Sequence, residues 1–245
     1  MKKILMIIGS FVLVQTGFSQ TDTTTVFEPS PRNPEKLITR NNDHLLIQLG
    51  YAGWANTPDS INTSGLPRTF NIYLMLDFPF KSNPNLSVAI GPGIATDNIF
   101  FDKTYVGIKD NTNTLAFRDV SDTNHFKKYK LTTAWLEAPL ELRYTADPDN
   151  AKRGLKLAIG GKVGTLLSAH TKGKNWQNKD EQSLINYTQK EKSKRFFNTT
   201  RFSVMARAGW GNFTLYGNYQ INPLFKEGLG PDIKPYSIGL TISGL

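Results

Sequence analysis

Apolar and polar residues alternate through most of this chain, and this alternation most limits how the chain can fold. The clearest case is the segment 70–80. One of its faces carries Phe70, Ile72, Leu74, Leu76, Phe78 and Phe80, and the other carries Asn71, Tyr73, Met75, Asp77 and Pro79. A period of two predicts β-strands whose two faces meet different surroundings.

Seven further segments show the same period: 44–54, 86–96, 131–144, 155–170, 201–210, 213–222 and 235–244. Eight strands of about ten residues are what a small transmembrane barrel requires. We therefore expect an all-β fold, an eight-stranded antiparallel up-and-down transmembrane β-barrel, over residues 43–245. A water-soluble barrel or sandwich shows the same alternation, so other features must decide between them.

The lengths of the predicted connections favour the membrane barrel. Short connections fall at 81–85, 146–150 and Gly211-Asn212, and they alternate with longer ones such as 99–130 and 171–200. Outer-membrane barrels have long external loops and short periplasmic turns. The pattern predicts that both ends of the barrel and its short turns face the periplasm.

Aromatic residues on the apolar face fall at two heights, which predicts a girdle at each membrane–water interface. The girdle near the short turns comprises Phe78, Phe80, Tyr144, Trp210 and Phe213. The girdle near the long loops comprises Tyr51, Phe70, Phe202, Tyr219 and Tyr236.

The first 19 residues have the three parts of a secretory signal peptide. Lys2 and Lys3 precede a short apolar core, Ile4 to Val14, and small residues follow at Gly17 and Ser19. We expect residues 1–19 to be removed on export and residues 20–42 to form a polar periplasmic segment. The chain has no Cys, which excludes disulfides and thiolate metal sites.

If the apolar face meets lipid, the polar face fills the interior. Charged residues on that face predict an ion-paired network, because buried charges persist when they are paired and hydrogen-bonded. Its expected members are Asp77, Glu137, Glu141, Arg143, Lys156, Lys162, Arg201 and Arg207. A carboxylate pair performing acid–base chemistry is the alternative. Pro92 and Pro139 fall within strands and predict local bulges.

Three stretches carry a family resemblance: Leu136–Tyr144 (LEAPLELRY), Ile159–Gly164 (IGGKVG), and the ending Tyr216–Phe225 (YGNYQINPLF) with Pro235–Leu240 (PYSIGL). Together they resemble the PorT-type outer-membrane β-barrel family of Bacteroidota. The resemblance implies an outer-membrane barrel, and the best-known member of that family assists type IX protein secretion. Most members have no assigned activity, so the resemblance implies no catalytic residues.

Few residues are suited to metal binding or catalysis. His44, His125 and His170 lack the spacing of metal ligands, so we expect no metal site and no cofactor. Ser168 and His170 stand near the external rim of a strand, where alternation places both on the inner face. A Ser beside a base is the minimum for a lipid hydrolase, and this enzyme class stays open as an alternative.

The segment 171–199 is rich in lysine, and we expect it to be a solvated loop, with binding of lipopolysaccharide phosphates or another polyanion as the alternative. The expected partners are outer-membrane lipid, including lipopolysaccharide, and proteins of secretion or of the envelope. Nucleic acid is not expected. The leading hypothesis is a non-enzymatic barrel that anchors long loops for surface contact, secretion or envelope integrity. A rim-active hydrolase and a soluble lipocalin-like binding barrel are the alternatives.

Overall fold

The computed structural model describes residues 44–148, 150 and 153–244. The expected signal peptide (1–19) and polar segment (20–42) lie outside the described residues. No helix in the described part of the chain is long and apolar enough to cross a membrane.

The described residues form β-strands joined by turns and loops. The strands are β1 (Leu45–Ala55), β2 (Arg68–Leu74), β3 (Leu76–Pro79), β4 (Leu86–Ile90), β5 (Gly93–Phe101), β6 (Thr104–Val106), β7 (Phe117–Asp119), β8 (His125–Thr145), β9 (Leu155–Gln177), β10 (Ser183–Lys192), β11 (Thr200–Trp210), β12 (Phe213–Gln220) and β13 (Lys234–Ser243). All of their pairings are antiparallel.

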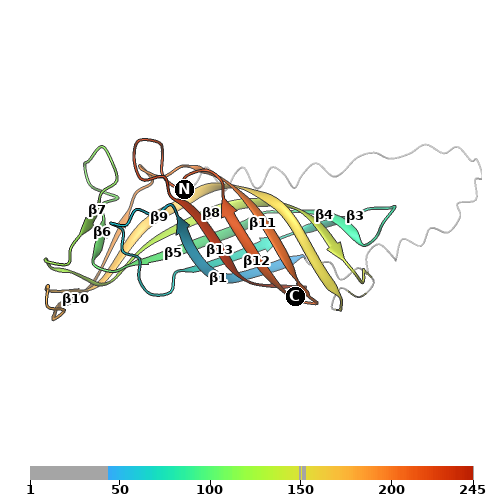
Figure 1. Ribbon diagram of the computed structural model, residues 1–245, viewed down its shortest axis with the longest axis horizontal. Helices are drawn as coiled ribbons and strands as arrows, with labels where there is room; N and C mark the ends of the chain where they lie inside the picture. Colours follow the sequence, from blue (N-terminus) through green and yellow to red (C-terminus); the bar gives the residue numbers. More distant parts are fainter. Residues whose placement is uncertain (1–43, 149, 151–152, 245) are drawn as a thin grey trace, which may run out of the picture. The chain divides into compact units, whose positions relative to one another are not determined.

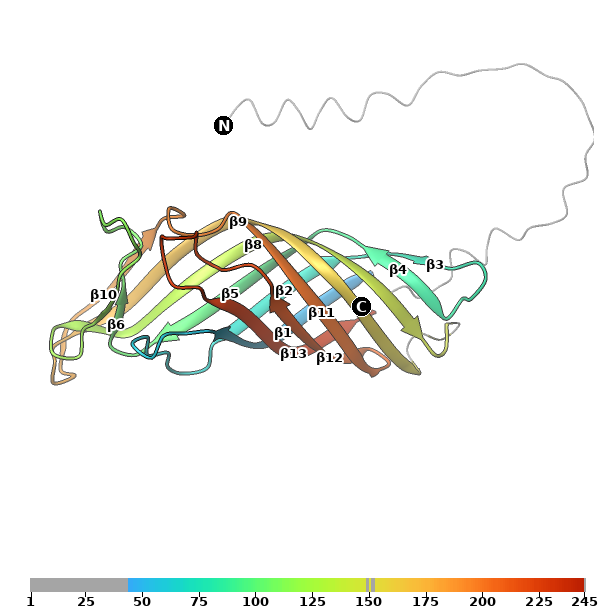
Figure 2. The same cartoon turned by 45° about the horizontal axis from the view of Figure 1, so that its top comes forward.

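The main sheet closes on itself. Its pairings run in a circuit through β1, β2, β5, β8, β9, β11, β12 and β13, and β13 pairs again with β1. Figures 1 and 2 show the resulting barrel, with its strands tilted to the long axis. Closure removes both sheet edges, so every strand of the ring has a partner on each side.

Two of the eight expected strands are each broken in two. Segment 70–80 divides into β2 and β3 at Met75, and segment 86–96 divides into β4 and β5 at Gly91-Pro92. Pro92 has no N–H to donate, and its carbonyl accepts from the N–H of Leu74 at 2.9 Å. A Cβ on Gly91 would lie 1.7 Å from the carbonyl oxygen of Leu74, so this close approach requires glycine.

The bulge expected at Pro139 is absent, since the register is continuous through its pairing with Lys162. A register shift occurs instead between Ala134 and Trp135, which pair with Ser168 and Leu166 and leave Leu167 as an extra residue. The bulge exchanges the two faces of β9 beyond this point.

The expected long connections contain more strand than the alternation predicted. β8 has 21 residues and β9 has 23, about twice what a tilted strand needs to cross a bilayer. Their outer halves continue past the ring, and β10 pairs with the end of β9, so segment 171–199 is largely paired strand and not the predicted loop, although most of β10 is solvent-exposed. β6 and β7 form a separate small hairpin at the same end (Figure 1).

Short turns gather at the other end of the barrel. Trp210 pairs with Phe213 across the two-residue turn Gly211-Asn212. Gly211 has a φ of 59°, which suits the first central position of a type II′ turn. The start of β1 and the end of β13 also lie at this end, because Leu46 pairs with Ser243.

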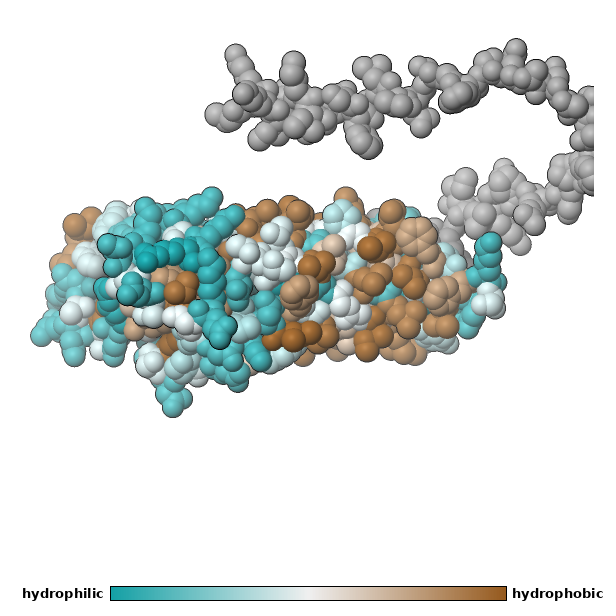
Figure 3. Space-filling model, turned by 90° about the horizontal axis from the view of Figure 1, so that it is seen from above, coloured by the Kyte–Doolittle hydropathy of each residue, from teal (hydrophilic) through white to brown (hydrophobic). Residues whose placement is uncertain are grey.

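Large apolar side chains cover the outside of the ring, visible as a hydrophobic region in Figure 3 beside the hydrophilic loop end. All ten residues assigned to the two girdles are exposed: Tyr51, Phe70, Phe78, Phe80, Tyr144, Phe202, Trp210, Phe213, Tyr219 and Tyr236. The register sets Trp210 beside Phe213 at one end of this surface and Tyr219 beside Tyr236 at the other. An apolar outside combined with a polar inside is the arrangement that lipid requires.

Replacing Leu140 by arginine tests the lipid-facing surface. Leu140 is 52% exposed and lies four residues from Tyr144, towards the middle of the apolar surface. Arginine at the bilayer midplane costs about 2–4 kcal/mol. We expect a loss of this size in the free energy of unfolding, measured by urea titration of the protein refolded into lipid vesicles.

Thr188→Arg provides the matched control, because Thr188 is exposed at the loop end on β10. It should leave the unfolding free energy nearly unchanged. Equal losses from both substitutions would contradict the assignment of the Leu140 face to lipid.

Candidate functional site

Two clusters of ion pairs fill the interior of the ring. In the first, Arg201 contacts both Glu137 and Asp97, the latter at 2.9 Å. Lys162 lies 3.3 Å from the other oxygen of Glu137, and Tyr73 donates a hydrogen bond to that same oxygen. Glu137 is 2% exposed, so this carboxylate is held away from water by three donors.

The second cluster surrounds Glu141 nearer the short turns. Arg143 and Arg207 each approach Glu141 Oε2 at 2.7 Å. Arg143 also lies 3.6 Å from Asp77, which accepts a hydrogen bond of 2.7 Å from Ser87. Glu137 and Glu141 each have two or more partners, and Asp97 is paired with Arg201, so among the described residues neither cluster leaves an unpaired carboxylate facing the interior.

The structure buries seven of the eight expected interior residues on ring strands, and the eighth, Asp77, lies on β3 and is partly exposed. Lys156 is buried and lines a small cavity with Arg143, Arg207 and Thr214. Sequence reasoning missed Asp97, which lies one residue past the predicted end of its strand, and Tyr73, which was assigned to the polar face without a partner. Alternation continued one residue past position 96, from Ala95 to Asp97, would have found it.

Uncharged polar side chains complete the interior beside these clusters. Thr69 donates to Asn71, Asn71 donates to Gln48, and Gln48 donates to Thr241, over distances of 3.1 to 3.2 Å. A ring of eight strands has an interior just wide enough for side chains. The interior therefore acts as a packed polar core and leaves no room for a wide aqueous channel.

The long connections fold into an ordered cap over the outer mouth of the ring. We call this set of residues the loop cap, and its core combines residues from the upper ring with residues from the connections. The core members that are at most 2% exposed and come from the connections or from β6 are Val106, Ile108, Phe196, Phe197, Leu224, Phe225 and Ile233. A cluster of this kind gives the loops a hydrophobic core of their own.

Phe225 is central to the loop cap. Its ring lies 5.1 Å from that of Phe197, 6.0 Å from that of Phe117 and 6.3 Å from that of Trp54. These centroid distances are typical of favourable aromatic pairs. Asn198 adds a polar link, because its side-chain amide donates to the carbonyl of Phe225 at 2.8 Å. The connection before β11 and the connection before β13 are thereby fixed to each other.

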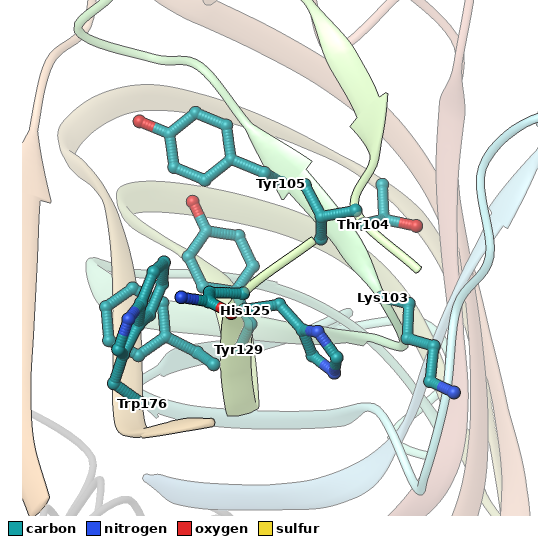
Figure 4. A pocket seen from close by; sticks show the side chains of 9 residues that line it. Lys103, Thr104, Tyr105, His125, Tyr129 and Trp176 are labelled. Atoms are coloured by element: carbon teal, nitrogen blue, oxygen red, sulfur yellow. The ribbon is translucent and has the colours of Figure 1, made fainter. Parts of the chain in front are cut away.

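A cavity of about 120 Å³ opens in the loop cap beside β6 (Figure 4). Trp176 and Lys103 lie on opposite sides of it, with Tyr105, Tyr129 and His125 between them. Pockets for drug-sized ligands have volumes of about 300 Å³ or more, so this cavity suits one ring or one short side chain.

Polar contacts tie the rim of this cavity to neighbouring segments. Tyr105 donates a hydrogen bond of 3.2 Å to Glu191 on β10. Burial, followed by the negative charge of Glu191, raises the pKa of Tyr105 to about 12, so the phenol remains a donor at neutral pH. Lys103 lies 3.1 Å from Glu181, and this contact raises the pKa of Lys103 and lowers that of Glu181.

The expected inward position of Ser168 and His170 is wrong. Beyond the bulge at Leu167, Ala169 and Thr171 take the inner face and are at most 1% exposed, while Ser168 and His170 are half-buried on the opposite face. In the described part of the chain, Nδ1 of His170 is buried and has no hydrogen-bond partner, so it does not bind the Ser168 hydroxyl. No group of three or more His, Cys, Asp or Glu that would hold a metal ion occurs in the described ranges.

A closed antiparallel ring with an apolar outside and an ion-paired inside defines an integral outer-membrane barrel. The family model for the outer membrane protein beta-barrel domain matches residues 14–227, and the chain belongs to this family. The protein is accordingly located in the outer membrane. No curated protein matches the sequence.

Among solved structures, the crystal structure of Ail, the attachment invasion locus protein of Yersinia pestis, aligns with this chain at 13% identity. The alignment covers 81% of this chain and 95% of Ail, with a TM-score of 0.36.

Truncating the central carboxylate of the interior tests how much the ion pairs stabilise the ring. Glu137→Ala leaves Lys162 and Arg201 without their shared partner in a buried site. Breaking a buried ion pair in this way costs about 3–5 kcal/mol. We expect that loss in the free energy of unfolding in vesicles, together with a lower temperature for the change in gel mobility on heating.

Asp77→Asn serves as the comparison, because Arg143 keeps its contact with Glu141 and Asp77 is less buried than Glu137. A smaller loss is expected for this variant. Equal losses of unfolding free energy in the two variants would mean that the burial of the carboxylate does not determine how much its ion pair stabilises the ring.

Phe225→Ala tests the loop cap separately from the ring. Replacing a buried phenylalanine by alanine lowers stability by about 3–5 kcal/mol. Here the substitution should destabilise the folded loops and leave the ring unchanged. We expect protease to cut the loop segments faster while the gel mobility of the unheated barrel stays unchanged. Phe225→Leu keeps most of the volume and should resist protease better, and equal protection of Phe225→Ala and the unaltered protein would contradict an ordered cap.

Proposed function

We propose that the protein is a non-enzymatic anchor whose eight-strand ring spans the outer membrane and holds the loop cap outside the cell for surface contact. The short turns and both ends of the ring would then face the periplasm. The length difference between the two sets of connections supports this orientation.

The observation that carries the proposal is the sealed lumen beneath an ordered cap. Ion pairs around Glu137 and Glu141 fill the ring, and the aromatic core around Phe225 closes its outer mouth. A barrel whose interior is filled with side chains serves as a membrane anchor, and the surface of the loop cap is the part that it exposes for contact. The cavity beside Tyr105 gives this surface a concave contact point for one ring or side chain.

The motifs shared with PorT-type barrels of Bacteroidota support a finer proposal, an accessory role in secretion or envelope integrity. In the LEAPLELRY stretch, Glu137, Glu141 and Arg143 are buried members of the two ion-pair clusters. The repeated charges of this motif thus serve the packing of the ring, which agrees with a family whose resemblance implies no catalytic residues. Envelope or secretion proteins are the proposed partners.

Neither alternative has a comparable observation in its favour. A lipid hydrolase needs a hydroxyl activated by a positioned base, and Ser168 and His170 are not hydrogen-bonded to each other in the described structure. A lipocalin-like protein needs an open interior, whereas this interior is occupied by charged side chains. Outer-membrane location also removes the soluble alternative.

Epitope insertion tests the proposed orientation. A tag after Asn111, between β6 and β7, should bind antibody on intact cells. A tag after Ser82, in the turn between β3 and β4, should bind antibody only after the outer membrane is permeabilised. Both sites are exposed loop positions. The reverse pattern would overturn the proposal.

Activity towards lipid is the second test. The refolded protein should release no fatty acid from phospholipid vesicles above the level of a heat-denatured sample. Hydrolysis that disappears in both Ser168→Ala and His170→Ala would replace the anchor proposal with the hydrolase.

A further inference from the structure

A group of lysines covers the outer face of the sheet that β8, β9 and β10 form beyond the ring. We call Lys130, Lys172, Lys174, Lys190 and Lys192 the lysine patch. The register sets Lys130 opposite Lys172 on the neighbouring strand, and Lys172 opposite Lys190 on the next. Three ammonium groups from three strands therefore stand in one row.

The two faces of the sheet formed by β8, β9 and β10 differ in charge and in the residues that they contact. Tyr129, Thr171 and Gly173 turn towards the loop cap, where Tyr129 packs against Phe101 and Phe126. Glu191, between Lys190 and Lys192 in sequence, also points to the cap side, where it accepts the hydrogen bond from Tyr105. The only acid within β10 is thus on the other face from the lysine patch.

Like charges directly opposite each other destabilise a sheet. The pKa of Lys130 is lowered, mainly by burial. Repulsion from neighbouring cations lowers it further, from Lys172, Arg68, Lys174 and Lys190. Within the described residues, no ion pair engages any lysine of the patch. Lys130 has one polar partner, the neutral side chain of Asn98 at 2.6 Å. Lys130 also lies 5.6 Å from the centroid of the Phe100 ring, but no carboxylate of the described residues neutralises the row, which leaves it open to an external anion.

The patch lies on the continuation of the lipid-facing surface. Leu136 on β8 and Leu167 on β9 are exposed on the same side, below the patch. Lys172 is five residues beyond Leu167, which is about 16 Å along a strand and about 12 Å along the membrane normal at the usual tilt. With Leu167 placed at the edge of the hydrocarbon core, this height reaches the polar headgroup layer and the space just outside it.

We propose that the lysine patch binds the phosphate groups of lipopolysaccharide molecules that surround the barrel in the outer leaflet. Lysine binds phosphate as a point charge from a flexible stem, so the row can follow phosphates at varying positions. Arg68, held 5.8 Å over the ring of Phe100 on β5, extends the positive surface towards β2. The sheet would be held against the headgroup layer, and its inner face would keep the loop cap in place.

This proposal rests on the outward orientation of the loop end proposed above, and the epitope experiment tests that orientation independently. Binding is measured with protein refolded in zwitterionic detergent micelles and fluorescently labelled lipopolysaccharide, followed by anisotropy. Lys172→Gln with Lys190→Gln removes the centre of the row. We expect affinity to fall by at least about threefold, as the loss of two exposed charge contacts predicts.

The control Lys109→Gln with Lys179→Gln removes the same charge from exposed loop positions at the same end and should bind as the unaltered protein does. Lys172→Arg with Lys190→Arg should retain binding. Dephosphorylated lipopolysaccharide should bind more weakly than the phosphorylated form, and inorganic phosphate at equal phosphate concentration should not compete.

Equal binding by the patch variant and the control would overturn the proposal, as would equal binding of dephosphorylated lipopolysaccharide. Competition by inorganic phosphate would reassign the patch to free anions, and preferential binding of heparin would reassign it to a soluble polyanion. The unheated gel mobility of each variant shows that the ring is folded, so a failure of binding is distinguishable from a failure of folding.

Discussion

Closure of the ring by β1 and β13 is the constraint on which the rest of the structure depends. Hydrocarbon offers no hydrogen-bonding partner, so each backbone N–H and C=O in the membrane must be paired within the protein. An antiparallel circuit achieves this without an open edge. It also forces alternate side chains inward, so the interior must be filled by whatever residues the period of two places there.

Charged side chains occupy much of the interior, and their ion pairs specify the register of the strands. Glu137 accepts from Arg201, Lys162 and Tyr73, which come from three other strands. A shift of one residue in β9 or β11 would turn Lys162 or Arg201 towards lipid and leave Glu137 buried without that partner. The ion pairs thus select one register of the ring, while the aromatic girdles outside fix its height in the membrane.

The long strands β8 and β9 connect the ring to the loop end. Because they continue past the ring, they present one side to the loop cap and turn the other side away from it. The extra residue at Leu167 determines which residues of β9 face the loop cap, because it exchanges the two faces of the strand beyond that point. Without it, Thr171 would face outward and Lys172 would enter the aromatic core. A single bulge therefore separates an apolar inner face from a basic outer one.

The amino-acid sequence by itself determined the alternation, and with it the strands of the ring, the exposed girdles and the inward-facing residues as far as the bulge at Leu167. These follow from a local period that needs no knowledge of partners. Tertiary structure alone decided the bulge at Leu167, the pairing of Asp97 with Arg201, the loop cap around Phe225 and the row through Lys172. Each of these depends on the register between strands distant in sequence, and register is set by pairing across the closed sheet rather than by any single segment.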